Sequence, residues 1–142
     1  MIKYFSIIIF LFIVDRFTKI YAVKKPLDND GGVFDLHINP NIAFSLPLPT
    51  MVLYPLLIVV IIIIVYLWLK SLKKKSILIW PWGMLIVGAF SNFIDRFYYQ
   101  GVVDFINVPF FTVFNLADIY ISLAVILILY YEAIYKSKNV KA

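Results

Sequence analysis

Four long apolar stretches decide what this chain can fold into. The clearest, residues 51–69, contains no charged side chain, and the others lie at about 4–21, 77–94 and 113–135. A helix needs about 20 apolar residues to cross roughly 30 Å of hydrocarbon. The composition agrees, because 63% of the residues are hydrophobic and 15% are charged, whereas a soluble domain carries about 25% charge. The sequence predicts an all-α integral membrane protein with four transmembrane helices, forming a single domain over residues 1–142.

The basic residues predict how the helices are oriented. Lysines gather in the connection at 70–75 and in the tail at 136–141, and such clusters mark the cytoplasmic side. We therefore expect both termini inside, a multi-pass topology, and no nucleic-acid binding despite the net charge of +5. The first stretch lacks a small-residue cleavage site and is expected to stay as a membrane span. Residues 22–50 form an outer surface segment, where the alternation at 33–38 predicts part of a small outward-facing β-sheet.

Residue counts remove several kinds of chemistry. The chain has no cysteine and a single histidine, His37. Thiol nucleophiles and cysteine-ligated metals are therefore excluded, and a histidine-based triad or multi-histidine metal site is hard to assemble. We expect no metal.

Charged side chains inside apolar helices are the next guide to function. Each costs at least about 2.5–3.5 kcal/mol at mid-bilayer, so it usually faces a protein interior or a watery cavity. Asp15 and Lys19 are four residues apart and can share one helix face. They form either part of a site or a simple ion pair, with Lys19 reaching toward the membrane interface.

The third stretch carries a similar group near its end. Asn92, Asp95 and Arg96 fall on one helical face, and Gly88 one turn earlier permits close helix approach. This group is either part of a site or an Asp95–Arg96 interfacial cluster that ends the span.

Two further aspartates are the strongest candidates for catalysis. Asp104 lies in the apolar run 101–106, and Asp118 follows Asn115 near the start of the fourth stretch. Asp118 can instead cap the helix, although apolar residues flank it on both sides. If the two carboxylates meet, they share a proton, and together they can activate water and protonate the carbonyl oxygen of a scissile amide.

These residues, taken in order, resemble the motif set of lipoprotein signal peptidase, or signal peptidase II, a bacterial inner-membrane aspartic protease. The matching segments are Asp15-Arg-Phe-Thr-Lys19, Asn39-x-x-x-Ala-Phe-Ser45, Gly88-Ala-x-x-Asn92-x-x-Asp95-Arg96, Gly101-Val-Val-Asp104-Phe and Phe114-Asn115-x-Ala117-Asp118. Single motifs of this kind are weak, but five in register over nearly the whole chain are specific.

The resemblance implies a function and a site. Asp104 and Asp118 correspond to the catalytic pair, and the remaining matched positions shape the site or support its aspartates: Asp15, Lys19, Asn39, Gly88, Asn92, Arg96, Asn115 and Ala117. The implied substrate is a diacylglyceryl-modified prolipoprotein, cut just before the modified cysteine. The resemblance also implies a monomer in contact with membrane lipids, no cofactor, an active site at the outer face, and inhibition by globomycin-type cyclic peptides.

Two departures and several alternatives accompany this interpretation. Asn41 and Ser91 stand where the family usually has glycine, which bears on the fit of the substrate. A Ser–Lys membrane peptidase using Ser45 and Lys19 is the alternative enzyme. A small ion- or proton-conducting protein and a non-catalytic assembly subunit are the alternatives outside enzymology.

Overall fold

A computed structural model describes residues 2–24, 33–41, 46–109 and 112–136 as four helices and a small sheet. The fourth helix continues directly into a π-helical turn, η2. The helices are α1 (Ile2–Lys24), α2 (Thr50–Lys73), α3 (Ile79–Tyr99), α4 (Leu116–Tyr130) and η2 (Tyr131–Lys136), and the strands are β1 (Phe34–Asn39), β2 (Val102–Val108) and β3 (Thr112–Phe114).

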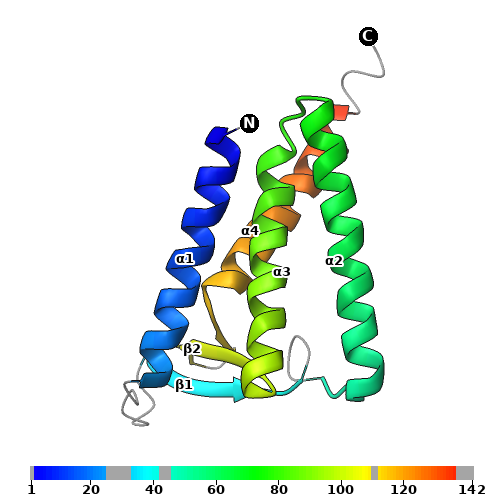
Figure 1. Cartoon of the computed structure of the whole chain (residues 1–142). Helices are drawn as coiled ribbons and strands as arrows, with labels where there is room; N and C mark the ends of the chain where they lie inside the picture. The colour runs from blue at the N-terminus through cyan, green and yellow to red at the C-terminus, as the bar shows by residue number, and fades with distance from the viewer. Residues whose placement is uncertain (1, 25–32, 42–45, 110–111, 137–142) are drawn as a thin grey trace.

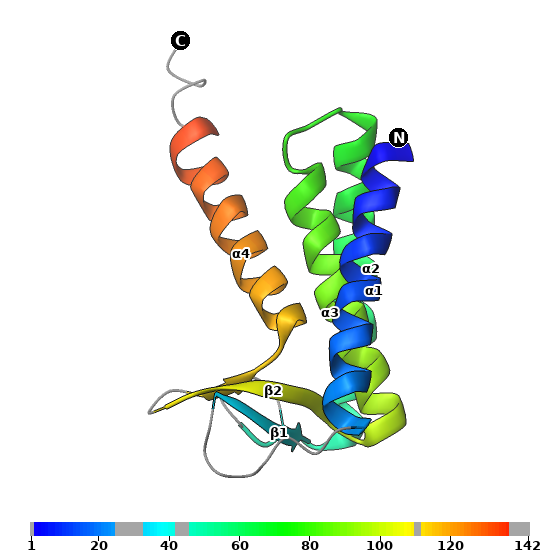
Figure 2. The same cartoon turned by 90° about the vertical axis from the view of Figure 1, so that its left-hand side faces the viewer.

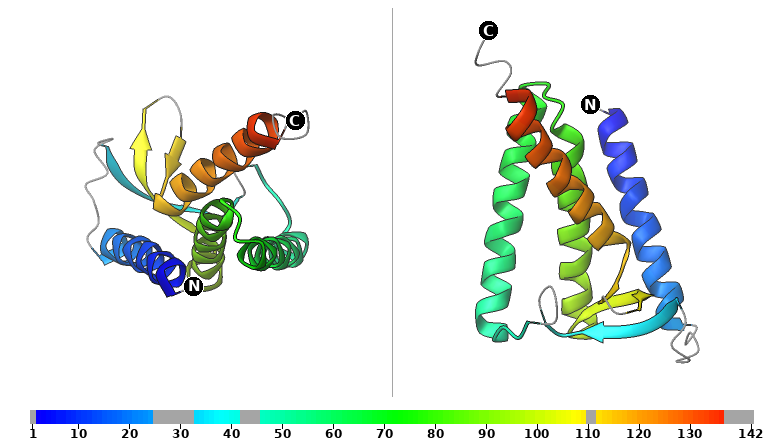
Figure 3. Two further views of the ribbon diagram at one scale, coloured as in Figure 1. Left: turned by 90° about the horizontal axis from the view of Figure 1, so that it is seen from above. Right: turned by 180° about the vertical axis from the view of Figure 1, so that it is seen from behind.

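The helix α3 is the centre of the bundle. It packs against each of the other three helices, and the view along the helix axes places it among them (Figure 3). The sheet lies across one end of the bundle (Figure 1), and α4 leans away from the other helices toward the opposite end (Figure 2). The start of α1, the α2–α3 connection and η2 all lie at that opposite end. The two lysine-bearing segments therefore start from one end of the molecule, as the sequence predicts.

The sheet is antiparallel with the order β1-β2-β3. His37 pairs with Asp104 and Asn39 with Val102, while the β2–β3 hairpin leads the chain into α4. The predicted strand at 33–38 is confirmed by β1, but the other two strands come from a region where none was predicted. Residues 101–105 are all buried, so this part of β2 lacks the polar–apolar alternation that identifies a half-exposed strand.

The start of the fourth helix differs from the prediction. The predicted span at 113–135 is wrong at its beginning, because residues 112–114 form β3 and α4 begins at Leu116. Asn115 is extended and is the N-cap, and Asp118 completes a capping box with it. The expectation that apolar flanks argue against capping is therefore wrong: Asp118 lies in the first helical turn and is part of the cap.

The apolar surface is distributed as in a protein surrounded by lipid. A small core around Ile64, Leu85 and Ala124 joins α2, α3 and α4, while large side chains on the outer faces stay uncovered, such as Ile62 and Leu129 at 61% and 62% exposure. Among the described residues, two helices are apolar and long enough to cross a membrane, Thr50–Lys73 and Leu116–Ala133. The other two helices carry charged residues in the half nearest the sheet.

Candidate active site

Two carboxylates approach each other through a chain of amide hydrogen bonds. Asp104 lies on β2 and Asp118 in the first turn of α4, the two elements that flank the β3 strand. The Asn115 amide donates to Asp104 Oδ1 at 2.7 Å and to Asn92 Oδ1 at 3.3 Å. Asn92 in turn donates to Asp118 Oδ1 at 2.8 Å. Residues from α3, β2 and α4 thus meet in one hydrogen-bonded group.

Burial changes the acidity of Asp104. Its side chain is 3% exposed, and desolvation, followed by the charge of Asp118, raises the pKa of Asp104 to about 7. Hydrogen bonds from Asn115 and Asn39 act in the opposite direction. A carboxyl group of this kind holds a proton near neutral pH, which an ordinary surface aspartate does not.

The capping box fixes the second carboxylate. The Asn115 backbone N–H donates to Asp118 Oδ2 at 3.2 Å, and the Asp118 N–H donates to Asn115 Oδ1 at 3.1 Å. Both Asp118 oxygens therefore accept a hydrogen bond, one from Asn92 and one from Asn115. The helix start itself positions this carboxylate, so capping and site geometry are the same feature.

A buried ionic network supports the amides. Lys19 Nζ donates to Asn92 Oδ1 at 2.7 Å and pairs with Asp95 at 2.7 Å and with Asp15 at 3.4 Å. Arg16 pairs with the second oxygen of Asp95. The predicted Asp15–Lys19 pair is confirmed. Two alternatives are wrong: Lys19 is fully buried instead of reaching the interface, and Asp95 pairs with α1 cations, not with Arg96.

Asp15 joins three helices at this end of the bundle. Its Oδ1 accepts from the Ala117 N–H at 2.8 Å, and its Oδ2 accepts from the Ser91 hydroxyl. Gly88 allows α3 to approach that point, because a Cβ there would lie 2.7 Å from the Ala117 carbonyl oxygen. Ser91, which stands where the family usually has glycine, contributes a hydrogen bond that glycine could not make.

Arg96 and Asn39 link the end of β1 to α3. Arg96 donates to the Asn41 carbonyl at 2.9 Å and to the Asn92 carbonyl at 3.3 Å, while Asn39 Oδ1 accepts from the Asn41 N–H at 3.0 Å. Tyr54 on α2 donates to the Arg96 carbonyl at 2.8 Å. All ten predicted site positions therefore lie at the sheet end, whereas Ser45 falls outside the described residues.

Two residues of the buried ionic network were not among the predicted site residues. Arg16 and Asp95 are opposite in charge and lie in the halves of α1 and α3 nearest the sheet, yet their pairing joins residues 79 positions apart. The available signal was the cost of charge in an apolar helix. That signal marks both residues as needing partners, but it does not say which partners they find.

Paired buried carboxylates held by hydrogen bonds are the arrangement that aspartic peptidases use, and here they lie at one end of an apolar helical bundle. The signal peptidase (SPase) II family matches residues 7–134. The chain belongs to this family, and its function is that of a lipoprotein signal peptidase, a membrane protease of the aspartic type.

Individual relatives agree. The lipoprotein signal peptidase of Pelagibacter ubique (strain HTCC1062) is 33% identical over 94% of this chain and 89% of its own length. A solved structure described as a bacterial membrane enzyme superposes with a TM-score of 0.80, at 28% identity, over 99% of this chain and 92% of that one. A second one superposes with a TM-score of 0.70, at 26% identity, over 93% of each chain.

Proposed function

We propose that Asp104 and Asp118 are the catalytic pair and that they cut a diacylglyceryl-modified prolipoprotein just before its modified cysteine. One observation carries the proposal: Asn115 and Asn92 tie the two carboxylates into a single hydrogen-bonded group. The SPase II family membership implies a prolipoprotein as the substrate. The exact bond and the lipid requirement belong to the proposal.

The hydrogen bonds suggest how the work is divided. Asp104 is buried while Asp118 is partly exposed, and its raised pKa makes Asp104 the group that carries a proton near neutral pH in this proposal. Asp118 accepts N–H donors at both oxygens, which favours its ionised form. Asp118 then takes a proton from water as the water oxygen attacks the scissile carbonyl carbon, and Asp104 gives its proton to the carbonyl oxygen. The tetrahedral intermediate collapses with cleavage of the C–N bond: Asp118 passes its proton to the leaving nitrogen, and Asp104 takes its proton back as the carbonyl re-forms.

The other site residues act by positioning. Lys19 anchors the Asn92 amide, and Asp15 holds the backbone of Ala117 beside Asp118. Gly88 permits the close helix contact there. Arg96 and Asn39 order the end of β1 next to the pair. The Asn115 cap then connects all of these to Asp104.

The charge distribution supports an orientation. All four helices cross the bacterial inner membrane in this proposal, with the sheet end outside and the lysine-bearing end inside. The acyl chains of the substrate remain in the bilayer while its peptide lies across the carboxylates, so recognition becomes a two-dimensional search with a positioned bond. The chain acts as a monomer and is inhibited by globomycin-type peptides.

Cleavage assays with matched variants test the assignment. The purified protein, in detergent with EDTA, is given a diacylglyceryl-modified prolipoprotein beside Asp104→Asn, Asp118→Asn and Ser45→Ala. We expect each aspartate variant to lose at least about 10²–10⁴-fold in rate, while wild type and Ser45→Ala release the signal peptide. Cleavage by either aspartate variant at the wild-type rate, or its loss in Ser45→Ala alone, would contradict the pair and favour the Ser–Lys alternative.

A further inference from the structure

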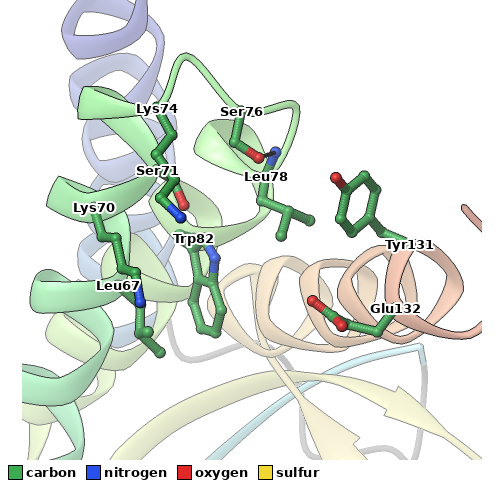
Figure 4. Close-up of a pocket in the computed structure, with 9 residues that line it drawn as sticks. All are labelled: Leu67, Lys70, Ser71, Lys74, Ser76, Leu78, Trp82, Tyr131 and Glu132. Atoms are coloured by element: carbon green, nitrogen blue, oxygen red, sulfur yellow. Dashed lines mark hydrogen bonds between the residues drawn. The ribbon is translucent and has the colours of Figure 1, made fainter. Parts of the chain in front are cut away.

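The end of the bundle opposite the sheet contains a pocket that the peptidase reaction does not use. Its volume is about 370 Å³, and it lies between the end of α2, the start of α3 and η2. Lys70 and Lys74 project from the α2 side, Tyr131 and Glu132 from the α4 side, and Trp82 lies between them (Figure 4). The pocket therefore has charged walls and an aromatic interior.

The lining combines two chemistries. Leu67 and Leu78 add apolar surface next to Trp82, while Ser71 and Ser76 add hydroxyl groups near the lysines. Two lysines and one glutamate give the lining one net positive charge. A phosphodiester carries one negative charge, and a phospholipid presents it directly above its apolar chains. The pocket matches both parts of such a molecule.

The lysine ammonium groups are available for a ligand. Within the described residues, neither Lys70 nor Lys74 makes a side-chain hydrogen bond or ion pair, and both are exposed. The exposed aromatic and lysine residues at this end are the kinds that gather where a membrane meets water. Basic pockets between helix ends at that level bind lipid headgroups.

We propose that this pocket binds the phosphodiester headgroup of a membrane phospholipid, with Lys70 and Lys74 on the phosphate and the acyl chains against the apolar lining. Bound in this way, the lipid connects the α2–α3 turn to η2 at the end where α4 leans away from the bundle. The proposal is independent of the catalytic assignment, because none of these residues belongs to the carboxylate group.

The neighbouring lysines provide a matched control. Lys73 and Lys75 lie in the same turn and are exposed like the first pair, but they do not line the pocket. A general attraction of basic loops to lipid would depend on both pairs equally. A built site depends on Lys70 and Lys74 alone.

Native mass spectrometry of the full-length protein in detergent tests the proposal. Palmitoyl-oleoyl phosphatidylglycerol is titrated into wild type, Lys70→Gln/Lys74→Gln and Lys73→Gln/Lys75→Gln, and the dissociation constant of the first bound lipid is measured. We expect a loss of about fivefold for each pocket lysine, or about 25-fold for the pair, and no change in the control pair. Normal prolipoprotein cleavage by both double variants shows that they are folded.

Two further probes separate the possible ligands. Palmitoyl-oleoyl glycerol has the same chains without phosphate, and inorganic phosphate has the anion without chains. We expect neither to bind at the concentration where the phospholipid saturates. Equal weakening by both lysine pairs, equal binding of the diacylglycerol, or displacement of the lipid by inorganic phosphate would each overturn the proposal.

Discussion

The two ends of the bundle bury different kinds of side chain. At the sheet end, Asp15, Lys19 and Asp95 are fully buried and satisfied by one another and by amides. Toward the other end, the core is apolar, around Ile64, Leu85 and Ala124, and the charged residues lie on the rim. The difference shows that one set of helices is held together in two ways: by directional polar contacts at one end and by packing at the other.

The largest expected effect is at the buried cation. Among the described residues, Lys19→Met leaves Asp95 paired with Arg16 alone and leaves Asp15 without a cationic partner. Breaking a buried pair in this way lowers the free energy of unfolding by about 3–5 kcal/mol, measured by denaturation in mixed micelles. Cleavage also falls, because Asn92 loses its anchor.

A second lysine on the same helix is the control for this change. Lys24 ends α1 and is exposed, so Lys24→Met should change the free energy of unfolding by no more than about 0.5 kcal/mol. If the two variants are equally stable, the sheet end is not held by its ionic network and the comparison of the two ends fails.

The next effect concerns the pH dependence of Asp104. The folded state binds a proton with a pKa of about 7, above the ordinary value of 3.8. Between these values the folded state holds a proton that the unfolded state has lost, so the free energy of unfolding falls as pH rises toward 7. Asp104→Asn escapes this cost and should be more stable than wild type by roughly 2–4 kcal/mol at about pH 8. The gap should close near pH 4.

Melting temperatures of wild type and Asp104→Asn across pH measure this difference in stability. Cleavage rates across pH test the Asp104 carboxyl independently. Wild-type cleavage should fall about tenfold per pH unit above pH 7, because the shared proton is lost. Asp35→Asn on β1, outside the hydrogen-bonded group, is the control and should leave both pH profiles unchanged. If Asp104→Asn proves less stable than wild type at pH 8, Asp104 bears no cost of buried charge.

Substitutions at two glycines of α3 compare the helix packing beside the candidate site, at Gly88, with the packing nearer the opposite end, at Gly83. An added Cβ at Gly88 would meet the Ala117 carbonyl oxygen at 2.7 Å, a backbone atom that cannot move aside alone. An added Cβ at Gly83 would meet the end of the flexible Ile8 side chain at 2.6 Å. Gly88→Ala should therefore cost about 1–3 kcal/mol and reduce cleavage, while Gly83→Ala costs less and leaves cleavage unchanged. If Gly83→Ala and Gly88→Ala lose the same stability and the same cleavage activity, the close helix contact beside Asp118 does not position the site.

The smallest effect lies in the α2–α3 turn. Lys75 has a positive φ of 49°, and its N–H and that of Ser76 bond to the Leu72 and Ser71 carbonyls, the C-terminal pattern that usually uses glycine. Lys75→Gly should raise the free energy of unfolding by about 0.5–1 kcal/mol, because the left-handed conformation strains a side chain. Lys73→Gly, at the last helical residue of α2, should lower it instead. Thermal melts of both variants check the signs.

The sequence predicted the helices better than the sheet, for a physical reason. An apolar run of 20 residues has few ways to satisfy its backbone, so the four helices could be located to within a few residues. β2 is buried along most of its length, which removes the alternation that marks a strand. Most of the short β3 was included in the fourth apolar stretch, at 113–135, which was predicted as helix.

The candidate site, too, could be predicted from the sequence only in part. The cost of buried charge marked Asp104 and Asp118 individually, and the family motifs indicated that they belong together. Neither could show that Lys19, besides pairing with Asp15, would also contact Asn92 and Asp95, because those two contacts join distant parts of the chain. Local spacing instead favoured partners within one helix, which is why Asp95 was matched with Arg96.

The pairing of Arg16 with Asp95, 79 residues later, also bears on the order of synthesis. While α1 emerges from the ribosome, the residue that neutralises Arg16 has not yet been translated, and α2 must be made in between. The nascent first helix therefore carries unmatched charge until α3 follows it. In the proposed four-span topology, the polar end of α1 stays beside water, lipid headgroups or the insertion machinery until α3 is made. The helices α1 and α3 then complete their membrane integration together, whereas the uncharged core of α2 can enter alone.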